Sequence, residues 1–156
     1  MLIAIDGSNC SLRAIEYAGR QFSGVIDLHI TLLHVLPYPP ARLWDDGHIP
    51  TKKEKAERER EIDRWLMDQR AKTEPLFDKA LSVLVEAGIS RTQLTTKTIS
   101  DSSDIADSIL EETNDGGYQT LVVGRCGISA VKDFLMGSVT TKIINRGTRA
   151  AVCVVE

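Results

Sequence analysis

The sequence predicts a doubly wound α/β domain, in which a parallel sheet is covered by helices on both faces. Five short runs rich in apolar or β-branched residues read as strands, and amphipathic helical patterns lie between them. This alternation is typical of parallel sheets, because each crossover needs a helix-length connection. Four of the runs are nearly continuously apolar, which indicates strands buried on both faces. A length of 156 residues favours one domain over residues 1–156.

The strands are located by their apolar residues, since a strand between two helical layers has little room for polar side chains. They are predicted at Leu2–Ile5, Leu28–Leu36, Leu94–Ile99, Thr120–Val123 and Ala150–Val155. Apolar or small side chains at helical spacing follow the first, third and fourth strands. The marker residues are Leu12, Ile15, Gly19 and Phe22, then Ile105, Ile109 and Leu110, then Val139, Ile143 and Ile144.

The segment between the second and third strands is the longest connection. Residues 37–50 contain four prolines and are predicted to form an irregular loop. In residues 51–88, apolar or small residues recur every three or four positions through Pro75, which predicts one long charged helix kinked there. The alternative is a break at Thr73-Glu74, with Pro75 in the first turn of a second helix. The charged run Lys52–Arg64 is typical of a solvated face, and partner binding is its alternative role.

Composition excludes several classes of protein. A formal net charge of −3 argues against general nucleic-acid binding, which depends on many Lys and Arg contacts to phosphate. No apolar run has the length of a membrane span, and the apolar N-terminal run is too short for a signal peptide. The cysteines Cys10, Cys126 and Cys153 are far apart and form no C-x-x-C pair, so neither a zinc site nor a redox motif is indicated. A cytoplasmic location is therefore expected.

The turn after the first strand is one candidate for binding chemistry. Ligands of open α/β sheets bind beyond the carboxyl ends of the strands, where the strand order reverses. Gly7 allows a tight turn, and Ser8, Asn9 or Ser11 can cap the next helix. Asp6 either accepts hydrogen bonds from nearby backbone amides or binds a ribose, a base or a metal-bound oxygen. The sequence leaves both roles open.

A glycine pattern after the fourth strand is the second candidate. Gly124 ends the strand, and Gly127 permits a backbone turn and close approach of a ligand, because glycine has no Cβ. Gly137-Ser138 precedes the last helix, whose free N–H groups and dipole suit phosphate. The Ser138 hydroxyl can donate to a phosphate oxygen or serve as an N-cap. The spacing predicts a phosphate cradle, to which Arg125, Lys132 and Lys142 are available as cations.

Other nucleotide motifs are missing from the sequence. It has no G-x-x-x-x-G-K-[ST] run and no G-x-G-x-x-G after the first strand, so neither a P-loop nor a Rossmann site is expected. No Ser/His/Asp or Cys/His arrangement can be assigned, and no general base stands beside the glycines. The expected site therefore binds phosphate with slow or no hydrolysis.

The glycine pattern resembles that of the universal stress protein family. Its ATP-binding branch has Gly, two residues, Gly, nine residues, then Gly-Ser or Gly-Thr, and Gly124, Gly127 and Gly137-Ser138 match this spacing completely. "IAIDGS" and "TLLHVLP" resemble the first two strands of the family, "SDSSDIADSIL" the turn after the third, and "AAVCVVE" the last strand.

The resemblance implies a five-stranded sheet in the order 3-2-1-4-5 and a bound ATP, ADP or AMP, often with Mg²⁺ or Mn²⁺ on the phosphates. By resemblance, the glycines and Ser138 hold the phosphates, Val139 and Thr140 extend that contact, Asp6 faces the nucleoside, and the Val35 backbone contacts adenine. The full set of implied nucleotide-binding residues is Asp6, Gly7, Ser8, Val35, Val123, Gly124, Arg125, Gly127, Gly137, Ser138, Val139 and Thr140. A homodimer through Ala150–Val155 is also implied, and an unpaired apolar edge strand favours such pairing.

Three functions are compatible with this pattern. A regulatory ATP-binding module is favoured over an interaction protein with an empty pocket, because the glycine motif is intact. An enzyme on the same scaffold is disfavoured, because the H-x-G-H and S-G-G-x-D-S motifs of related nucleotide enzymes are absent. Two features depart from the family: the long connection at 37–88, and Cys126 within the glycine loop. The thiol raises the chance of redox sensitivity.

Overall fold

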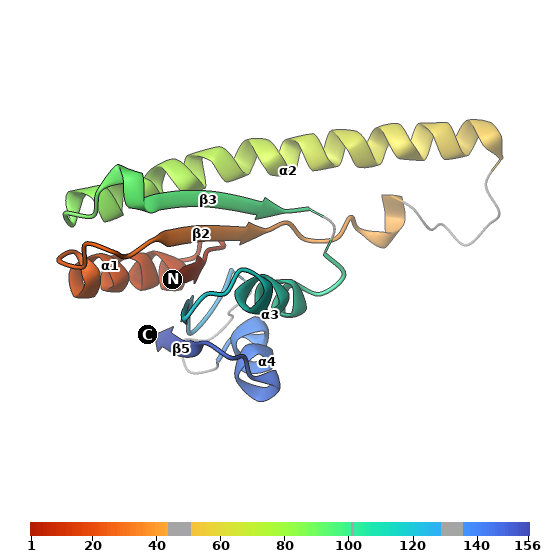
Figure 1. Ribbon diagram of the computed structural model, residues 1–156. Coiled ribbons are helices and arrows are strands. Elements are labelled where there is room, and N and C mark those ends of the chain that lie inside the picture. The colour runs from red at the N-terminus through yellow and green to blue at the C-terminus, as the bar shows by residue number, and fades with distance from the viewer. Residues whose placement is uncertain (44–50, 101, 129–135) are drawn as a thin grey trace.

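Five parallel strands form one sheet in the order β3-β2-β1-β4-β5, which confirms the predicted topology. The strands are β1 (Leu2–Ala4), β2 (Ile30–Val35), β3 (Leu94–Ile99), β4 (Thr120–Gly124) and β5 (Ala151–Val155). Figure 1 shows the chain as a computed structural model, and the structure describes residues 1–43, 51–100, 102–128 and 136–156.

The helices are divided between the two faces of the sheet. They are α1 (Asn9–Phe22), α2 (Lys52–Glu86), α3 (Ile105–Asp115) and α4 (Ser138–Arg146), with short 3-10 turns η1 (Ala41–Leu43) and η2 (Arg91–Gln93). Side chains of α1 and α2 share one buried cluster with the sheet, and side chains of α3 and α4 share another. This division follows from right-handed crossovers in a sheet whose strand order reverses once.

Alternation along the strands builds these two cores. Leu2 and Leu33 belong to the α3 and α4 side, whereas their neighbours Ile3 and Leu32 belong to the α1 and α2 side. All four are completely buried. Since successive strand residues point to opposite faces, a sheet covered on both sides needs apolar residues at every position. This two-sided burial explains the nearly continuous apolar runs in the sequence.

Helix α2 is a single helix that runs through Pro75. The alternative of a break at Thr73-Glu74 is wrong, whereas the kink at Pro75 stays a prediction. The helix begins at a capping box, in which Thr51 and Glu54 satisfy each other's backbone amides. Its buried residues are Thr73, Ala80 and Leu84, all in its second half.

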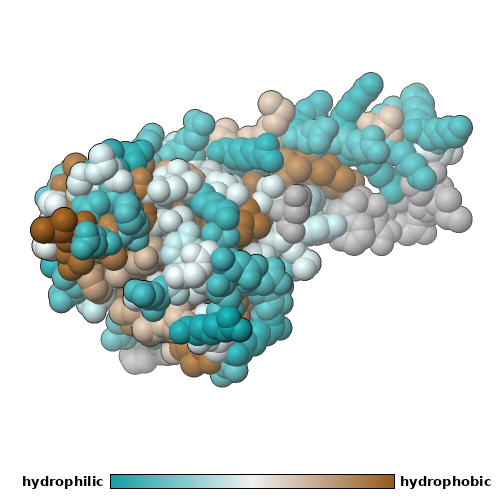
Figure 2. All heavy atoms as spheres, viewed as in Figure 1, coloured by the Kyte–Doolittle hydropathy of each residue, from teal (hydrophilic) through white to brown (hydrophobic). Residues whose placement is uncertain are grey.

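The first half of α2 extends beyond the sheet (Figure 1). Hydrophilic residues cover most of this projecting end (Figure 2), and Lys53 pairs with Glu57 one turn along, at 3.9 Å between Nζ and Oε1. A solvated face with i,i+4 pairs, as predicted, accounts for these charges. Although α2 is long enough to cross a bilayer, it is too highly charged, and no other helix in the described ranges meets the requirement either.

Several predicted bounds need correction. Strand β1 ends at Ala4 rather than Ile5, β4 runs one residue further to Gly124, and Ala150 precedes β5. Strand β2 is shorter than Leu28–Leu36, because its ladders to β1 and β3 cover only Ile30–Val35. An apolar residue next to a strand can be buried in the same core without pairing with a neighbouring strand. Leu36, which follows β2 and is buried, is an example. The predicted irregular loop contains η1, and its residues 44–50 lie outside the described part.

Candidate functional site

The candidate site lies where the strand order reverses. Strands β1 and β4 are neighbours, with Leu2 opposite Leu121, although one opens the chain and the other comes fourth. Their carboxyl ends lead into the Asp6–Ser8 turn and into the glycine loop that begins at Gly124. Crevices at such reversal points are where open α/β sheets bind ligands. The two turns singled out from the sequence are therefore adjacent in space.

The Asp6 carboxylate joins these two turns. Its Oδ1 accepts a hydrogen bond from the Ser8 amide at 2.9 Å, and its Oδ2 accepts one from the Ile128 amide at 3.1 Å. The first is the local turn bond that the sequence left open. The second comes from a residue 122 positions away and holds the glycine loop against the end of β1. Asp6 thus has a structural role, and its half-buried carboxylate lies within the predicted cradle.

Ser8 is the N-cap residue of α1, among the three candidates Ser8, Asn9 and Ser11. Its Oγ accepts a hydrogen bond from the Ser11 amide at 3.1 Å. The same hydroxyl lies 3.5 Å from the Cys126 carbonyl oxygen, to which it can donate. Gly7 has a φ of 83°, a conformation that glycine adopts without the cost paid by other residues. The tight turn predicted at Gly7 is therefore present.

None of the three loop glycines has a positive φ, so the backbone angles do not require glycine, and at Gly124 and Gly127 the reason is close approach. A Cβ placed on Gly124 would lie 2.6 Å from the carbonyl carbon of Cys10, and one on Gly127 would lie 2.9 Å from Asp6 Oδ2. A Cβ on Gly137 would meet the backbone of residues 125–127 at 3.4 Å. Glycine is required where the backbone packs closely against another backbone or a ligand. The glycines therefore stand where the loop packs against the first turn of α1, against Asp6 and against its own backbone at residues 125–127.

The start of α4 closes the cradle. Gly137 is its N-cap residue, and the Gly137 amide donates to the Arg125 carbonyl oxygen at 2.8 Å. Ser138 is the first helical residue and is exposed. The alternative role of Ser138 as N-cap is therefore wrong. The amides of Ser138, Val139 and Thr140 have no acceptor inside the helix, because the first four N–H groups of a helix lack one.

Other predicted site residues are engaged in the fold. The Thr140 hydroxyl donates to the Gly124 carbonyl oxygen at 2.8 Å, and it ties α4 to the end of β4. The side chains of Val35 and Val123 are buried, and the half-buried Val139 packs against the same cluster. Any contact of these valines with a ligand would thus involve the backbone. Arg125 forms an ion pair with Glu156, at 3.3 Å between Nε and Oε1.

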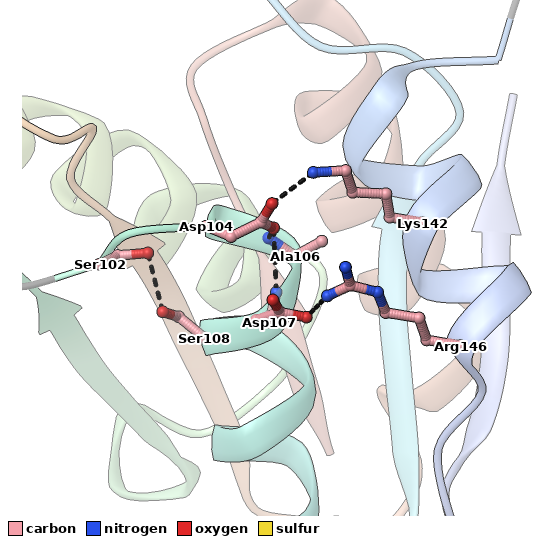
Figure 3. Close-up of polar contacts among 7 residues, drawn as sticks. All are labelled: Ser102, Asp104, Ala106, Asp107, Ser108, Lys142 and Arg146. Carbon is pink, nitrogen blue, oxygen red and sulfur yellow. Dashed lines mark hydrogen bonds and ion pairs between the residues drawn. The ribbon is translucent and has the colours of Figure 1, made fainter.

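The structure describes one of the two lysines that the sequence made available to the phosphate cradle. Lys132 lies outside the described residues, and Lys142 forms an ion pair with Asp104, the N-cap residue of α3. Figure 3 shows Asp104, the N-cap of α3, facing Lys142 of α4, and Asp107 of α3 facing Arg146 of α4. These two pairs clamp the helices that cover one face of the sheet. Lys142 is therefore part of a helix–helix contact in this structure.

The Lys142→Met substitution is expected to raise the pKa of Asp104. The Lys142 ammonium, as hydrogen-bond partner, holds that pKa below its ordinary value of 3.8; partial burial opposes the shift, and the Ala106 amide adds to it. A carboxylate whose pKa is lowered by folding stabilises the protein above its unfolded pKa, and the contribution is lost as pH falls through the folded pKa. At pH 7 the loss should not exceed about 1 kcal/mol, because the pair is exposed to solvent.

Carboxyl chemical shifts of Asp104, followed by NMR, and urea unfolding at two pH values measure this effect. Lys142→Arg is the matched control and should leave both quantities near those of the wild type. The stability difference between Lys142→Met and wild type should shrink below the Asp104 pKa. An unchanged Asp104 titration in Lys142→Met would contradict the assignment.

Two features of the site leave no signal in the sequence. Cys10 and Cys126 are joined by a disulfide, with 5.6 Å between their Cα atoms, although they are 116 positions apart. The spacing of the cysteines excludes only a C-x-x-C motif, and it does not predict this distant pair; Cys153 is the free cysteine. The Ile128 amide was also missed, because the hydrogen-bonding role of a backbone group does not depend on its residue type.

Comparison with known proteins places the chain in a family. The model of the universal stress protein family matches residues 1–154. Universal stress protein YxiE of Bacillus subtilis (strain 168) is 26% identical over 161 residues, which cover 95% of this chain and 93% of that protein.

Solved structures share the fold. A universal stress protein in complex with cAMP has a TM-score of 0.62 at 19% identity and covers 99% of this chain and 94% of its own. The universal stress protein from Archaeoglobus fulgidus in complex with dAMP has a TM-score of 0.56 at 18% identity and covers 99% of this chain and 95% of its own. At these identities the likeness carries the fold alone. With the family model spanning nearly the whole chain, this protein belongs to the universal stress protein family.

Proposed function

We propose that this protein binds an adenine nucleotide, ATP or its products ADP and AMP, at the carboxyl ends of β1 and β4. The observation that carries the proposal is the position of the glycine loop, which packs against Cys10 and Asp6 at the end of β1 and leads into the first amides of α4, which have no acceptor within the helix. Backbone N–H groups at a helix N-terminus bind phosphate well. Family members in complex with cAMP and dAMP support the choice of an adenine nucleotide.

The roles of individual residues follow from their positions. Phosphate oxygens would lie against the backbone of the glycine loop, where Gly127 and Gly137 present no side chain, and the amides of Ser138 to Thr140 would donate to them, with the Ser138 hydroxyl as a further donor. Asp6 would accept a ribose hydroxyl in exchange for one of its two backbone amides. Val35 and Val123 would present backbone groups to the base.

A divalent cation fits this site only through the phosphates. Both oxygens of Asp6 accept backbone N–H groups, and no cluster of three His, Cys, Asp or Glu side chains exists among the residues described. Mg²⁺ prefers oxygen ligands and commonly binds to substrate phosphates with one or two carboxylates. Mg²⁺ or Mn²⁺ would therefore enter with the nucleotide.

The function is regulatory, with slow or no hydrolysis of ATP. Asp6, the carboxylate in contact with the glycine loop, is held by two amides, and it is not placed as a free general base. Nucleotide occupancy would instead change the choice of partner in the course of a stress response.

Mass spectrometry of nucleotide released from the denatured purified protein, followed by ATP titration with and without Mg²⁺, tests the proposal. We expect binding in the micromolar to millimolar range and negligible turnover. Absence of binding at millimolar ATP under both conditions would refute it. Turnover well above that of an Asp6→Ala, Ser138→Ala double variant would instead favour an enzyme.

We further propose a homodimer through β5, the edge strand of the sheet. Ala151 donates its amide to Gln119 and Val155 accepts from Arg125, so these residues use their backbone groups toward β4. Because backbone groups alternate along a strand, the amides of Val152 and Val154 point outward and can pair with a second copy.

The Val154→Pro substitution is expected to convert the dimer into a monomer. Proline removes an outward N–H group and blocks strand pairing, while the ladder to β4 keeps its bonds. Sedimentation velocity at several concentrations measures the change, and Val154→Ala is the matched control that should remain dimeric. A Val154→Pro protein of unchanged mass would argue against this interface.

A further inference from the structure

We propose that Cys10 and Cys126 are a redox modification site whose disulfide lowers the affinity of the cradle for nucleotide. The inference rests on the proposed function of the same site. The two cysteines come from different parts of the fold: Cys10 lies in the first turn of α1, and Cys126 lies between Gly124 and Gly127. The disulfide therefore ties the glycine loop to the helix that follows β1.

The disulfide influences the Asp6 carboxylate through the Ile128 amide. Cys126 is two residues before Ile128, whose amide donates to Asp6 Oδ2 at 3.1 Å. The other described contact of Cys126 across to this turn is the Ser8 hydroxyl at 3.5 Å, the limit of a hydrogen bond. With the disulfide formed, the loop is held over Asp6 and both carboxylate oxygens are occupied. Reduction releases the loop, so that a ligand hydroxyl can replace the Ile128 amide.

The surroundings of Cys10 suit thiol–disulfide exchange. The Arg13 guanidinium donates to Cys10 Sγ, at 3.1 Å, and Cys10 lies at a helix N-terminus. A neighbouring cation and a helix N-terminus both favour the thiolate, which is the attacking species. Cys10 is only 1% exposed, whereas Cys126 is half-buried. The more accessible Cys126 is therefore the sulfur that an oxidant reaches first.

The oxidation is an exchange with a low-molecular-weight disulfide such as oxidised glutathione. The Cys126 thiolate attacks one sulfur of the reagent, forms a mixed disulfide and releases one thiolate. The Cys10 thiolate then attacks the Cys126 sulfur, forms the Cys10–Cys126 bond and releases a second thiolate. The two cysteines together lose two electrons and two protons, and the reagent is reduced to two thiols. In a reducing cytoplasm, disulfides of this kind are usually transient and redox-sensing.

Two measurements on the full chain test the proposal, each in oxidised glutathione and in dithiothreitol. The first is amide hydrogen exchange by NMR, which needs no nucleotide. The Ile128 amide should exchange at least about tenfold faster after reduction. The Ser8 amide, whose bond to Asp6 Oδ1 is local to the turn after β1, should change much less and is the internal control. Thiol alkylation with mass spectrometry establishes which cysteines are joined.

The second measurement is the Kd for ATP, which should fall about five- to tenfold on reduction. Cys126→Ser should bind like the reduced protein under both conditions, whereas Cys153→Ala should keep the full redox response. Failure of Cys10 and Cys126 to become linked, an unchanged Ile128 exchange, or an oxidised form that binds ATP as tightly as the reduced form or more tightly would each overturn the proposal. If neither form binds ATP but Ile128 exchange still responds, the nucleotide function fails while the redox control of the loop survives.

Discussion

The Gly124→Ala substitution is expected to destabilise the protein by about 1–3 kcal/mol, the usual cost of an overpacked interior. The added Cβ would lie 2.6 Å from the carbonyl carbon, 2.8 Å from the carbonyl oxygen and 2.9 Å from the Cβ of Cys10. Two of these atoms belong to the backbone of α1, which cannot move without disturbing its packing on β4. The substitution therefore lowers the free energy of unfolding of the protein and does not act on ligand binding alone.

Urea unfolding of Gly124→Ala, with and without reductant, measures this loss. Gly24→Ala is the matched control, because a Cβ at Gly24 meets no atom within 4 Å and its φ is not positive. That variant should stay within about 0.5 kcal/mol of the wild type. Equal stability of the two variants would show that α1 and β4 are not packed as closely as described.

The sequence was sufficient for the sheet but not for all roles within the site. Apolar runs and helical spacing located every strand to within two residues at each end, because burial on both faces leaves a strong pattern. The order of strands came from the resemblance to a family. Pro75 was placed inside a helix correctly, since the apolar spacing continued in phase on both of its sides.

Side-chain roles were less predictable where they depend on contacts between distant segments. Ser138 reads as an N-cap, yet Gly137 takes that position, and nothing in the local sequence separates the two. The bond between Asp6 and Ile128 and the disulfide between Cys10 and Cys126 join parts of the chain more than 100 positions apart. Such pairs appear only when β1 and β4 are brought together, because residue spacing reports local periodicity alone.

Replacing both Gly127 and Gly137 by valine is expected to weaken ATP binding on the order of 100-fold, or about 2.7 kcal/mol. A side chain at Gly127 would push the Asp6 carboxylate aside, because its Cβ would lie 2.9 Å from Oδ2. A side chain at Gly137 would stand over the backbone of residues 125–127, where phosphate oxygens are proposed to lie. The two changes thus fill the cradle from both sides.

The fold should survive this double substitution better than it survives Gly124→Ala. The Gly127 contact is the end of a side chain that can rotate, and the Gly137 contacts are 3.4 Å, which small shifts can relieve. ATP titration gives the affinity, and circular dichroism with thermal unfolding reports the fold. If the double variant unfolds, Gly137→Val alone replaces it. Ser138→Ala removes one hydrogen-bond donor and should weaken ATP binding only about fivefold. If a folded Gly137→Val protein bound ATP as tightly as the wild type, the phosphates would have to lie elsewhere. The close packing of the glycines would then serve only to join α4 and the loop to the sheet.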